Sequence, residues 1–318
     1  MTPRRILLTG AAGFVGRHLR ARLAACSPAI RLLATGETGG PEILPLDVTD
    51  EAAARAMLDD FQPDAVVHLA AVAAVPEANR AAERAWEVNF SGTCRLARAV
   101  LESAPSAWFL FVSTAASYGR SFRAGMPLSE EAPLAPLETY AATKAAAEMA
   151  LSAMVSEGLR LVRLRPFNHI GPGQSERFAI AAFAAQIARI EAGLQPPELA
   201  VGWLAAERDF LDVRDVCAGY AACLERAETL ESGIAINLAS GQARPIGTVL
   251  EELIALSRVP IVIRTDQARL RWADLPRTLG DATLAARLLD WRPEIPWRGT
   301  LADILADARA RVEKAKTC

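Results

Sequence analysis

The first half of the chain alternates short apolar runs with longer stretches in which apolar residues recur at helical spacing. The apolar runs predict strands that are buried on both faces, and they comprise residues 6–9, 30–34, 65–69, 108–112 and 161–164. The stretches between them predict helices over residues 14–25, 51–61, 86–101 and 140–156. Strands and helices that alternate in this way form a parallel sheet covered on both faces, so we expect an α/β fold with a doubly wound Rossmann sheet.

The pattern changes after Arg165, where loops rich in proline and glycine appear and the helical spacing becomes less regular. Strands are predicted over residues 210–212 and 234–238, and helices over residues 178–192, 216–226, 246–256, 282–289 and 301–312. We therefore expect residues 1–165, joined by parts of 205–240, to form one large domain. Residues 166–318 are expected to form mainly a smaller C-terminal lobe.

Charge and cysteine content exclude several classes of partner. The 35 basic and 37 acidic residues give a net charge of −2, and no block of like charge predicts binding to nucleic acid. No apolar run has the length of a membrane span or a signal-peptide core, so we expect no membrane partner. Five cysteines without a CxxC pair indicate reduced thiols in the cytoplasm, and with only three histidines we expect no metal site.

Three glycines follow the first predicted strand, in the segment TGAAGFVG at residues 9–16, and a predicted helix comes directly after it. Glycines at this spacing allow a tight turn, close approach of the backbone to a pyrophosphate, and close packing of the helix on the strand. The helix N-terminus adds free N–H groups that face the anion. The sequence therefore predicts a dinucleotide site in residues 1–165, with contacts from Gly10, Gly13, Phe14, Val15 and Gly16.

The choice between NAD and NADP depends on the end of the second strand. No carboxylate stands in residues 33–36, and Glu37 follows late, so nothing there is expected to repel the 2′-phosphate of NADP. Arg17 either contacts that phosphate or is a solvated helix residue, and the sequence leaves both open. We expect NADP rather than NAD. Further cofactor contacts are predicted after the third and fourth strands and in the next helix, at Asp47, Val48, Leu69, Ala70, Ala71 and Asn89.

Tyr140 and Lys144 stand four residues apart at the start of a predicted helix, which places them on one face. A free tyrosine has a pKa of about 10, and a neighbouring ammonium group is expected to lower that pKa toward neutrality. The lysine can also hydrogen-bond the ribose of a nicotinamide. Thr114 stands at the end of the fifth strand, where it either hydrogen-bonds the substrate oxygen that Tyr140 protonates or caps the following turn.

Together these motifs resemble the extended short-chain dehydrogenase/reductase family, the NAD-dependent epimerases and dehydratases. The resemblance spans nearly the whole chain and rests on TGAAGFVG, the Asp-Val pair, HLAA, the Ser-Thr strand end and YAATK. It implies that Thr114, Tyr140 and Lys144 are catalytic, with Tyr140 and Lys144 also in contact with the cofactor. It further implies that the large domain binds the dinucleotide and that the C-terminal lobe is a substrate-binding lobe for a nucleotide sugar.

Two alanines narrow the range of reactions that the chain can catalyse. Dehydratases of this family carry acidic residues after the catalytic hydroxyl residue, where this chain has Ala115 and Ala116. Methyl groups transfer no protons, so dehydration is disfavoured, and the lack of a cysteine at position 116 argues against a 3,5-epimerase. Four segments are similar to reductases that act on GDP-4-keto-6-deoxy-D-mannose, although Ala115, Ala116 and Trp203 depart from their pattern. These segments are residues 165–174, 183–191, 201–213 and 269–276.

By that similarity, Asn168, Arg208 and Arg271 contact the nucleotide sugar, and the two arginines hold its diphosphate. Guanidinium groups pair with phosphate oxygens in a bidentate way. All three residues stand in segments that we interpret as loops, which argues against surface ion pairs on a helix. Gln186 and Glu191 are predicted to contact guanine, although a solvated helix face explains them equally well.

We therefore expect reduction of a 4-keto-6-deoxy sugar nucleotide by NAD(P)H, namely conversion of GDP-4-keto-6-deoxy-D-mannose to GDP-D-rhamnose. Hydride delivery to the opposite face would give GDP-6-deoxy-talose, and the sequence leaves the face open. The alternatives are a 4-epimerase with tightly bound NAD and a non-catalytic nucleotide sensor with the same fold. We also expect a homodimer through the helices of residues 86–101 and 140–156, because both are rich in small residues: Ala97, Ala99, Ala142 and Ala145–Ala147.

Overall fold

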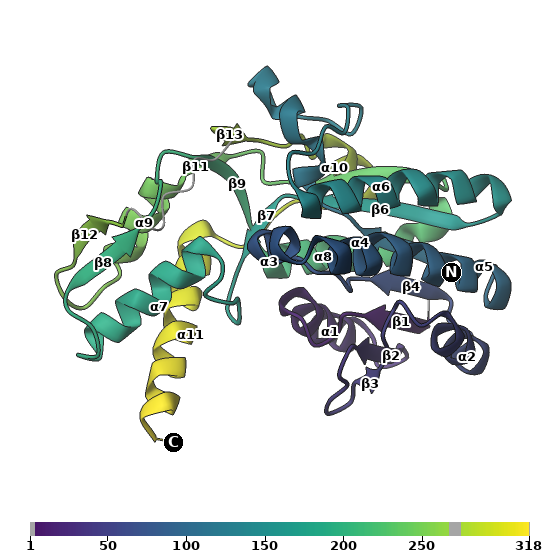
Figure 1. The fold of residues 1–318 in the computed structure, drawn as a ribbon, viewed down its shortest axis with the longest axis horizontal. Helices are drawn as coiled ribbons and strands as arrows, with labels where there is room; N and C mark the ends of the chain where they lie inside the picture. Colours follow the sequence, from purple (N-terminus) through teal and green to yellow (C-terminus); the bar gives the residue numbers. More distant parts are fainter. Residues whose placement is uncertain (1–3, 267–274, 318) are drawn as a thin grey trace.

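A seven-stranded parallel sheet forms the larger part of the molecule, with the strand order β10-β6-β5-β4-β1-β2-β3 (Figure 1). The structure is a computed structural model and describes residues 4–266 and 275–317. The order reverses direction between β1 and β4, as in a doubly wound sheet, so the predicted fold class is confirmed. The strands are β1 Arg5–Thr9, β2 Arg31–Gly36, β3 Leu44–Pro45, β4 Ala65–His68, β5 Trp108–Val112, β6 Arg160–Pro166 and β10 Ile234–Leu238.

Helices cover both faces of this sheet because each strand exposes an apolar side chain to either face. One face packs against α1 (Phe14–Cys26), α8 (Val213–Arg226) and α10 (Thr283–Leu289). The other packs against α2 (Glu51–Phe61), α5 (Thr93–Ser103) and α6 (Thr139–Met154). The C-terminal half therefore returns to the large domain twice, through α8 with β10 and again through α10. The second return was not predicted.

The helix predicted over residues 86–101 is interrupted. It consists of α4 (Ala82–Trp86), a π-helix over Glu87–Gly92 and then α5, and a short α3 (Val75–Arg80) precedes it. π-Helical turns of this kind are often found beside functional sites. Three 3₁₀ segments complete the large domain, over Ala115–Ala124, Val155–Glu157 and Ala227–Thr229.

The second lobe lies beside the sheet domain and has its own apolar core (Figure 1). A four-stranded sheet at its boundary contains β7 (Asn168–Ile170), β9 (Glu207–Asp212), β11 (Ala243–Pro245) and β13 (Arg277–Thr278). A two-stranded sheet pairs β8 (Glu198–Val201) with β12 (Val262–Thr265). The helices are α7 (Ala179–Glu191), α9 (Ile246–Ile254) and α11 (Trp297–Thr317).

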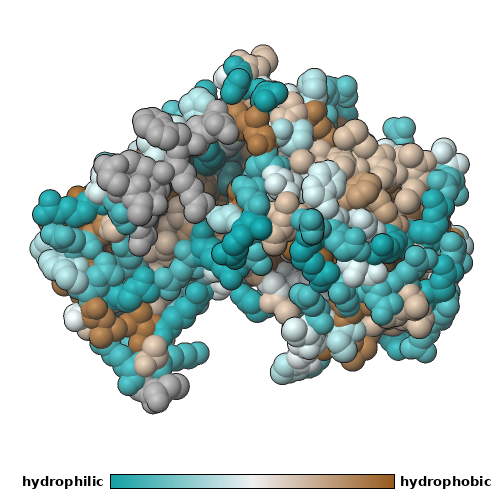
Figure 2. All heavy atoms as spheres, in the orientation of Figure 1, coloured by the Kyte–Doolittle hydropathy of each residue, from teal (hydrophilic) through white to brown (hydrophobic). Residues whose placement is uncertain are grey.

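A notch separates the two lobes in the outline of the molecule (Figure 2). The carboxyl ends of the main strands and the strands β7 and β9 lie where the lobes meet, so this boundary positions the site described below. Among the described residues, no helix has both the length and the apolar character needed to cross a membrane.

Two glycines with positive φ allow a matched test of the loop after β5. Gly119 has φ +47°, and a Cβ there would lie 1.9 Å from the carbonyl oxygen of Ala135, whereas Gly125 has φ +73° and open space around it. Gly125→Ala should therefore lower the free energy of unfolding by about 1–2 kcal/mol, the cost of the backbone conformation alone. Gly119→Ala should cost about 3 kcal/mol or more, because the clash with backbone is added. Urea unfolding of both variants measures this, and equal losses would contradict it.

Candidate active site

A cleft of about 1190 Å³ opens at the carboxyl ends of the strands β1, β2, β4 and β5 and extends to the second lobe. Such a volume exceeds that of an ordinary single-ligand pocket, and the switch point of a doubly wound sheet is the usual place for a ligand. Most of the predicted site residues line it: Gly10, Gly13, Phe14, Val15, Gly16, Asp47, Val48, Leu69, Ala70, Ala71, Thr114, Tyr140, Lys144, Asn168 and Arg208.

The glycine loop joins β1 to α1 at one end of the cleft. A Cβ on Gly16 would lie 2.4 Å from the carbonyl oxygen of Gly10, so only glycine lets the helix approach the strand this closely. Gly13 caps α1 without any side-chain hydrogen bond, and the first turn carries no acidic residue. The N–H groups of that turn therefore remain available to an anion, and the loop fits the pyrophosphate of a dinucleotide.

Two residues that the sequence predicted as cofactor contacts do not line the cleft. Asn89 is fully buried and does not line the cleft, because its amide group accepts from Val72 N at 2.8 Å and donates to Val72 O and Thr143 Oγ1. It supports the loop after β4, whose residues line the cleft. Arg17 does not line the cleft either, since its guanidinium donates to the carbonyl oxygens of Ala12 and Gly173 at 2.8 and 2.9 Å. Arg17 is nevertheless exposed to solvent, and it also joins α1 to the loop of the second lobe that contains Gly173.

The three predicted catalytic residues meet at one wall of the cleft. Tyr140 and Lys144 lie on one face of α6, and Thr114 lies at the end of β5, where its hydroxyl hydrogen-bonds the Tyr140 side chain. Thr114 Oγ1 also accepts from Ala116 N at 3.2 Å, so the same hydroxyl both caps the following turn and lies beside Tyr140. Lys144 is buried, and its ammonium donates to Val112 O at 2.7 Å.

The electrostatics of this wall differ from the expectation. Burial raises the pKa of Tyr140 to about 12, with a smaller contribution in the same direction from the charge of Glu138, against the opposing hydrogen bond from Thr114. Burial lowers the pKa of Lys144 to about 7, and the charge of Glu148 opposes this. The predicted lowering of the Tyr140 pKa by Lys144 is therefore wrong for the chain alone. The phenol is neutral at physiological pH, which is the form that donates a proton.

A buried ion pair lies behind this wall. The Glu148 carboxylate is fully buried; its two oxygens share a bifurcated hydrogen bond from Arg165 Nε at 3.1 and 3.0 Å, and one of them also accepts from Arg165 Nη2 at 2.6 Å. It also accepts from the hydroxyl of Ser113, the residue before Thr114. The sequence motifs did not include Glu148, although it stands four residues after Lys144 on the same helix face.

The predicted substrate contacts divide into two groups. Asn168 begins β7 and Arg208 lies within β9, so both stand in strands and not in loops, and both line the cleft. Arg208 donates to the carbonyl oxygen of Glu207 at 2.8 Å, and among the described residues no carboxylate pairs with it. Burial lowers the pKa of Arg208. Its guanidinium is therefore suited to receive an anion. Arg271 lies outside the described residues.

Gln186 and Glu191 are engaged inside the second lobe and do not line the cleft. The amide group of Gln186 is buried and exchanges hydrogen bonds with Ala200 N at 3.0 Å and Ala200 O at 3.2 Å. Glu191 accepts from Arg309 at 2.6 and 2.7 Å and from Arg258 N. The structure therefore does not bring these two residues to the cleft, and their polar atoms hold α7 to its neighbours.

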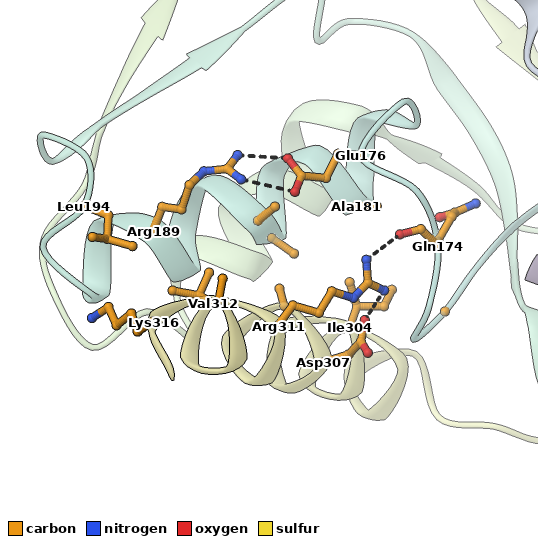
Figure 3. Close-up of a pocket in the computed structure, with 15 residues that line it drawn as sticks. Gln174, Glu176, Ala181, Arg189, Leu194, Ile304, Asp307, Arg311, Val312 and Lys316 are labelled. Carbon is orange, nitrogen blue, oxygen red and sulfur yellow. Dashed lines mark hydrogen bonds and ion pairs between the residues drawn. The ribbon is translucent and has the colours of Figure 1, made fainter. Parts of the chain in front are cut away.

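A smaller cavity of about 340 Å³ lies between α7 and α11 (Figure 3). Its arginines are occupied: Arg189 pairs with Glu176 through two hydrogen bonds, and Arg311 binds Asp307 and the carbonyl oxygen of Gln174 (Figure 3). These contacts stabilise the lobe. We therefore assign the chemistry of the molecule to the large cleft.

Several residues line the large cleft without having been predicted. Glu37 follows β2 directly, and Arg84 pairs with it at 3.1 Å and with Asp47 at 3.3 Å. Arg177 of the second lobe forms an ion pair with Glu77 of the large domain, and both line the cleft. Helical spacing could not reveal these contacts, because they join segments far apart in the sequence.

The comparisons agree with this geometry. Residues 6–239 match the NAD dependent epimerase/dehydratase family, so the chain belongs to that family. The GDP-6-deoxy-D-mannose reductase of Pseudomonas aeruginosa is 38% identical over 311 residues, which cover 98% of this chain and 99% of that protein. A structure of RMD from Pseudomonas aeruginosa complexed with NADPH has a TM-score of 0.87 at 37% identity and covers 97% of this chain and 99% of its own. The GDP-6-deoxy-D-talose 4-dehydrogenase of Aggregatibacter actinomycetemcomitans is 26% identical and covers 90% of this chain and 91% of its own length.

The burial of Lys144 predicts a dependence of stability on pH. Its pKa is about 7 in the folded chain against 10.5 for an ordinary lysine, so between these values the unfolded chain binds the extra proton. The contribution of Lys144 to the free energy of unfolding must then rise with pH. The Tm of the wild type minus that of Lys144→Met should therefore grow more positive from about pH 7 to about pH 9.5. Calorimetry at several pH values measures the difference, and a constant or falling difference would contradict the burial.

Proposed function

We propose that this protein reduces the C4 ketone of GDP-4-keto-6-deoxy-D-mannose with NAD(P)H to give GDP-D-rhamnose. The observation that carries the proposal is the wall formed by Thr114, Tyr140 and Lys144, next to which Ala115 and Ala116 line the same cleft. This wall has a proton donor for the oxygen of the ketone that is reduced. It has no acid–base pair at positions 115 and 116 to carry out dehydration. The 38% identity to a GDP-6-deoxy-D-mannose reductase supports the same substrate.

The residues of the wall perform the proton transfer. Tyr140 is neutral because burial raises its pKa to about 12, so it can donate its proton to the C4 oxygen as negative charge develops there. The Thr114 hydroxyl, which already contacts Tyr140, holds the same oxygen. Lys144 lies one helical turn further along and orients the ribose end of the cofactor. When bound, NAD(P)H supplies the hydride.

The glycine loop and the α1 N-terminus would hold the pyrophosphate of the cofactor, with Asp47, Val48 and Leu69–Ala71 beside the adenosine and ribose. We favour NADPH, which the similar structure from Pseudomonas aeruginosa contains. Glu37 would repel a 2′-phosphate, but the ion pair with Arg84 offsets its charge and places a guanidinium at the same spot. Asn168 and Arg208, together with Arg271, would hold the sugar and its diphosphate.

A coupled assay tests the reaction. GDP-mannose and NADPH with this protein alone should give no reaction, because Ala115 and Ala116 cannot move the C5 proton or the C6 hydroxyl group. Addition of a GDP-mannose 4,6-dehydratase should start NADPH oxidation, and NADH should be used less well. Tyr140→Phe should lower kcat by about 100-fold or more while cofactor affinity is unchanged, because only the proton donor is lost.

Three results would contradict the proposal. The first is conversion of GDP-mannose by this protein alone, which would assign it dehydration. The second is tightly bound NAD with no consumption of added NADPH, which would assign it 4-epimerisation. The third is retention of more than about a tenth of kcat by Tyr140→Phe, which would remove Tyr140 from the reaction.

A homodimer is the assembly that we propose, through α5 and α6. Ala97, Ala99, Ala145 and Ala147 of the predicted interface are buried in the core of this chain, so they cannot form it. Ala142, Ala146, Met149, Ala150 and Ala153 instead form an apolar stripe along the outer side of α6, and the Met149 side chain is 62% exposed. The free cysteines described in the structure fit the reducing cytoplasm that we propose as its compartment.

Light scattering tests the assembly. The wild type should have twice the mass of one chain at micromolar concentration, and Met149→Glu should shift it to the mass of one chain, because a charge would be buried in the interface. Leu194→Glu is the matched control, since Leu194 is similarly exposed on the second lobe. A wild type with the mass of one chain would refute the dimer.

A further inference from the structure

The cleft holds most of the unpaired buried polar groups of the described residues. Five buried side-chain atoms of the described residues have no hydrogen-bond partner, and four of them belong to residues that line the cleft: Glu138 Oε2, Gln174 Oε1, Tyr220 Oη and Thr278 Oγ1. Folded proteins pair nearly all buried polar groups, because each unpaired group costs free energy. Their concentration in one cleft indicates a ligand with polar groups that complete them.

Glu138 stands apart among the four because its carboxyl group lies beside the catalytic wall. It immediately precedes α6 and is two residues before Tyr140, and it makes no capping hydrogen bond to that helix. Its charge acts on the Tyr140 phenol. Burial raises the pKa of Glu138 to about 7, so the group has lost water without gaining a protein partner. Glu138 is also distant in the sequence from the glycine loop and from the residues that follow β2 and β3, which are the segments proposed to hold the cofactor.

We propose that Glu138 is a specificity-determining residue that hydrogen-bonds the sugar hydroxyl next to the carbonyl carbon served by Tyr140. This inference rests on the proposed function, which places the C4 oxygen between Thr114 and Tyr140. The neighbouring ring carbon that bears a hydroxyl is C3, since C5 bears the methyl group in a 6-deoxy sugar. A hydroxyl group suits an unpaired carboxyl oxygen, whereas a phosphate group would be repelled by it.

Ala115 and Ala116 strengthen the assignment. They line the same cleft with methyl groups, so they offer the sugar no hydrogen bond through their side chains. Glu138 supplies from the start of α6 a carboxyl group that the end of β5 lacks. Recognition of the hydroxyl next to the reacting carbon also positions that carbon against Tyr140.

The test combines a variant with a change in the ligand. Glu138→Ala should raise KM for the 4-keto product of the dehydratase by about 10-fold, with kcat within about 3-fold of the wild type, because one hydrogen bond to the substrate is lost. Glu138→Gln should restore most of the affinity, since the amide has the same shape and still accepts. For the 3-deoxy analogue, the wild type and Glu138→Ala should have nearly equal KM. Glu131→Ala removes an exposed carboxyl group from the preceding loop and serves as the control.

Binding of GDP-mannose by calorimetry provides a readout that does not need turnover. Glu138→Ala should weaken it by about 10-fold, while the affinity for NADPH stays unchanged and the Tm does not fall. Equal affinity of wild type and Glu138→Ala for GDP-mannose would overturn the inference, as would a loss that is the same for the 3-deoxy analogue. If the wild type binds GDP-mannose through Glu138 but reduces no 4-keto sugar, the proposed reaction fails and the role of Glu138 in recognition stands.

Discussion

The buried ion pair between Glu148 and Arg165 is the contact on which the geometry of the site depends. Loss of one partner from such a pair costs roughly 3–5 kcal/mol, because the other charge remains buried. Glu148 shares a face of α6 with Tyr140 and Lys144, while Arg165 lies on β6 and Ser113 on the segment after β5. One carboxylate thus fixes the helix that carries the phenol relative to the strand that carries its hydroxyl partner.

A second buried acid joins the two lobes. Asp212 ends β9, caps α8 by accepting from Arg214 N, and accepts from Thr300 Oγ1 at 2.8 Å near the start of α11. β9 belongs to the second lobe, whereas α8 packs on the main sheet. Because the chain passes between the lobes at this residue and again at α10, the cleft is formed by segments whose packing is interdependent. The packing of these segments therefore positions Arg208 of β9 relative to the wall.

The sequence predicted most of the elements that depend on local periodicity. It did not predict which polar side chains point into the cleft and which point into the protein. The main strands and the glycine loop follow from apolar spacing and from the need for a tight turn. The strands β7 and β13 are only three and two residues long, so they are too short to show the alternation of apolar and polar residues that predicts a strand. The sequence predicts Asn89 and Gln186 as ligand contacts, yet in the structure each satisfies backbone groups from a distant segment. Only the tertiary structure brings those partners together.

Two sets of contacts join the large domain to one short loop of the second lobe. Arg17 and His18 of α1 bind the carbonyl oxygens of Gly173 and Pro172 at 2.9 and 2.8 Å. Four residues further along this loop, Arg177 forms an exposed ion pair with Glu77 of α3, which contributes less than about 1 kcal/mol and is weakened by salt. The carbonyl oxygens carry no net charge, so salt weakens the contacts of α1 less. Ionic strength therefore acts on one attachment of this loop more than on the other.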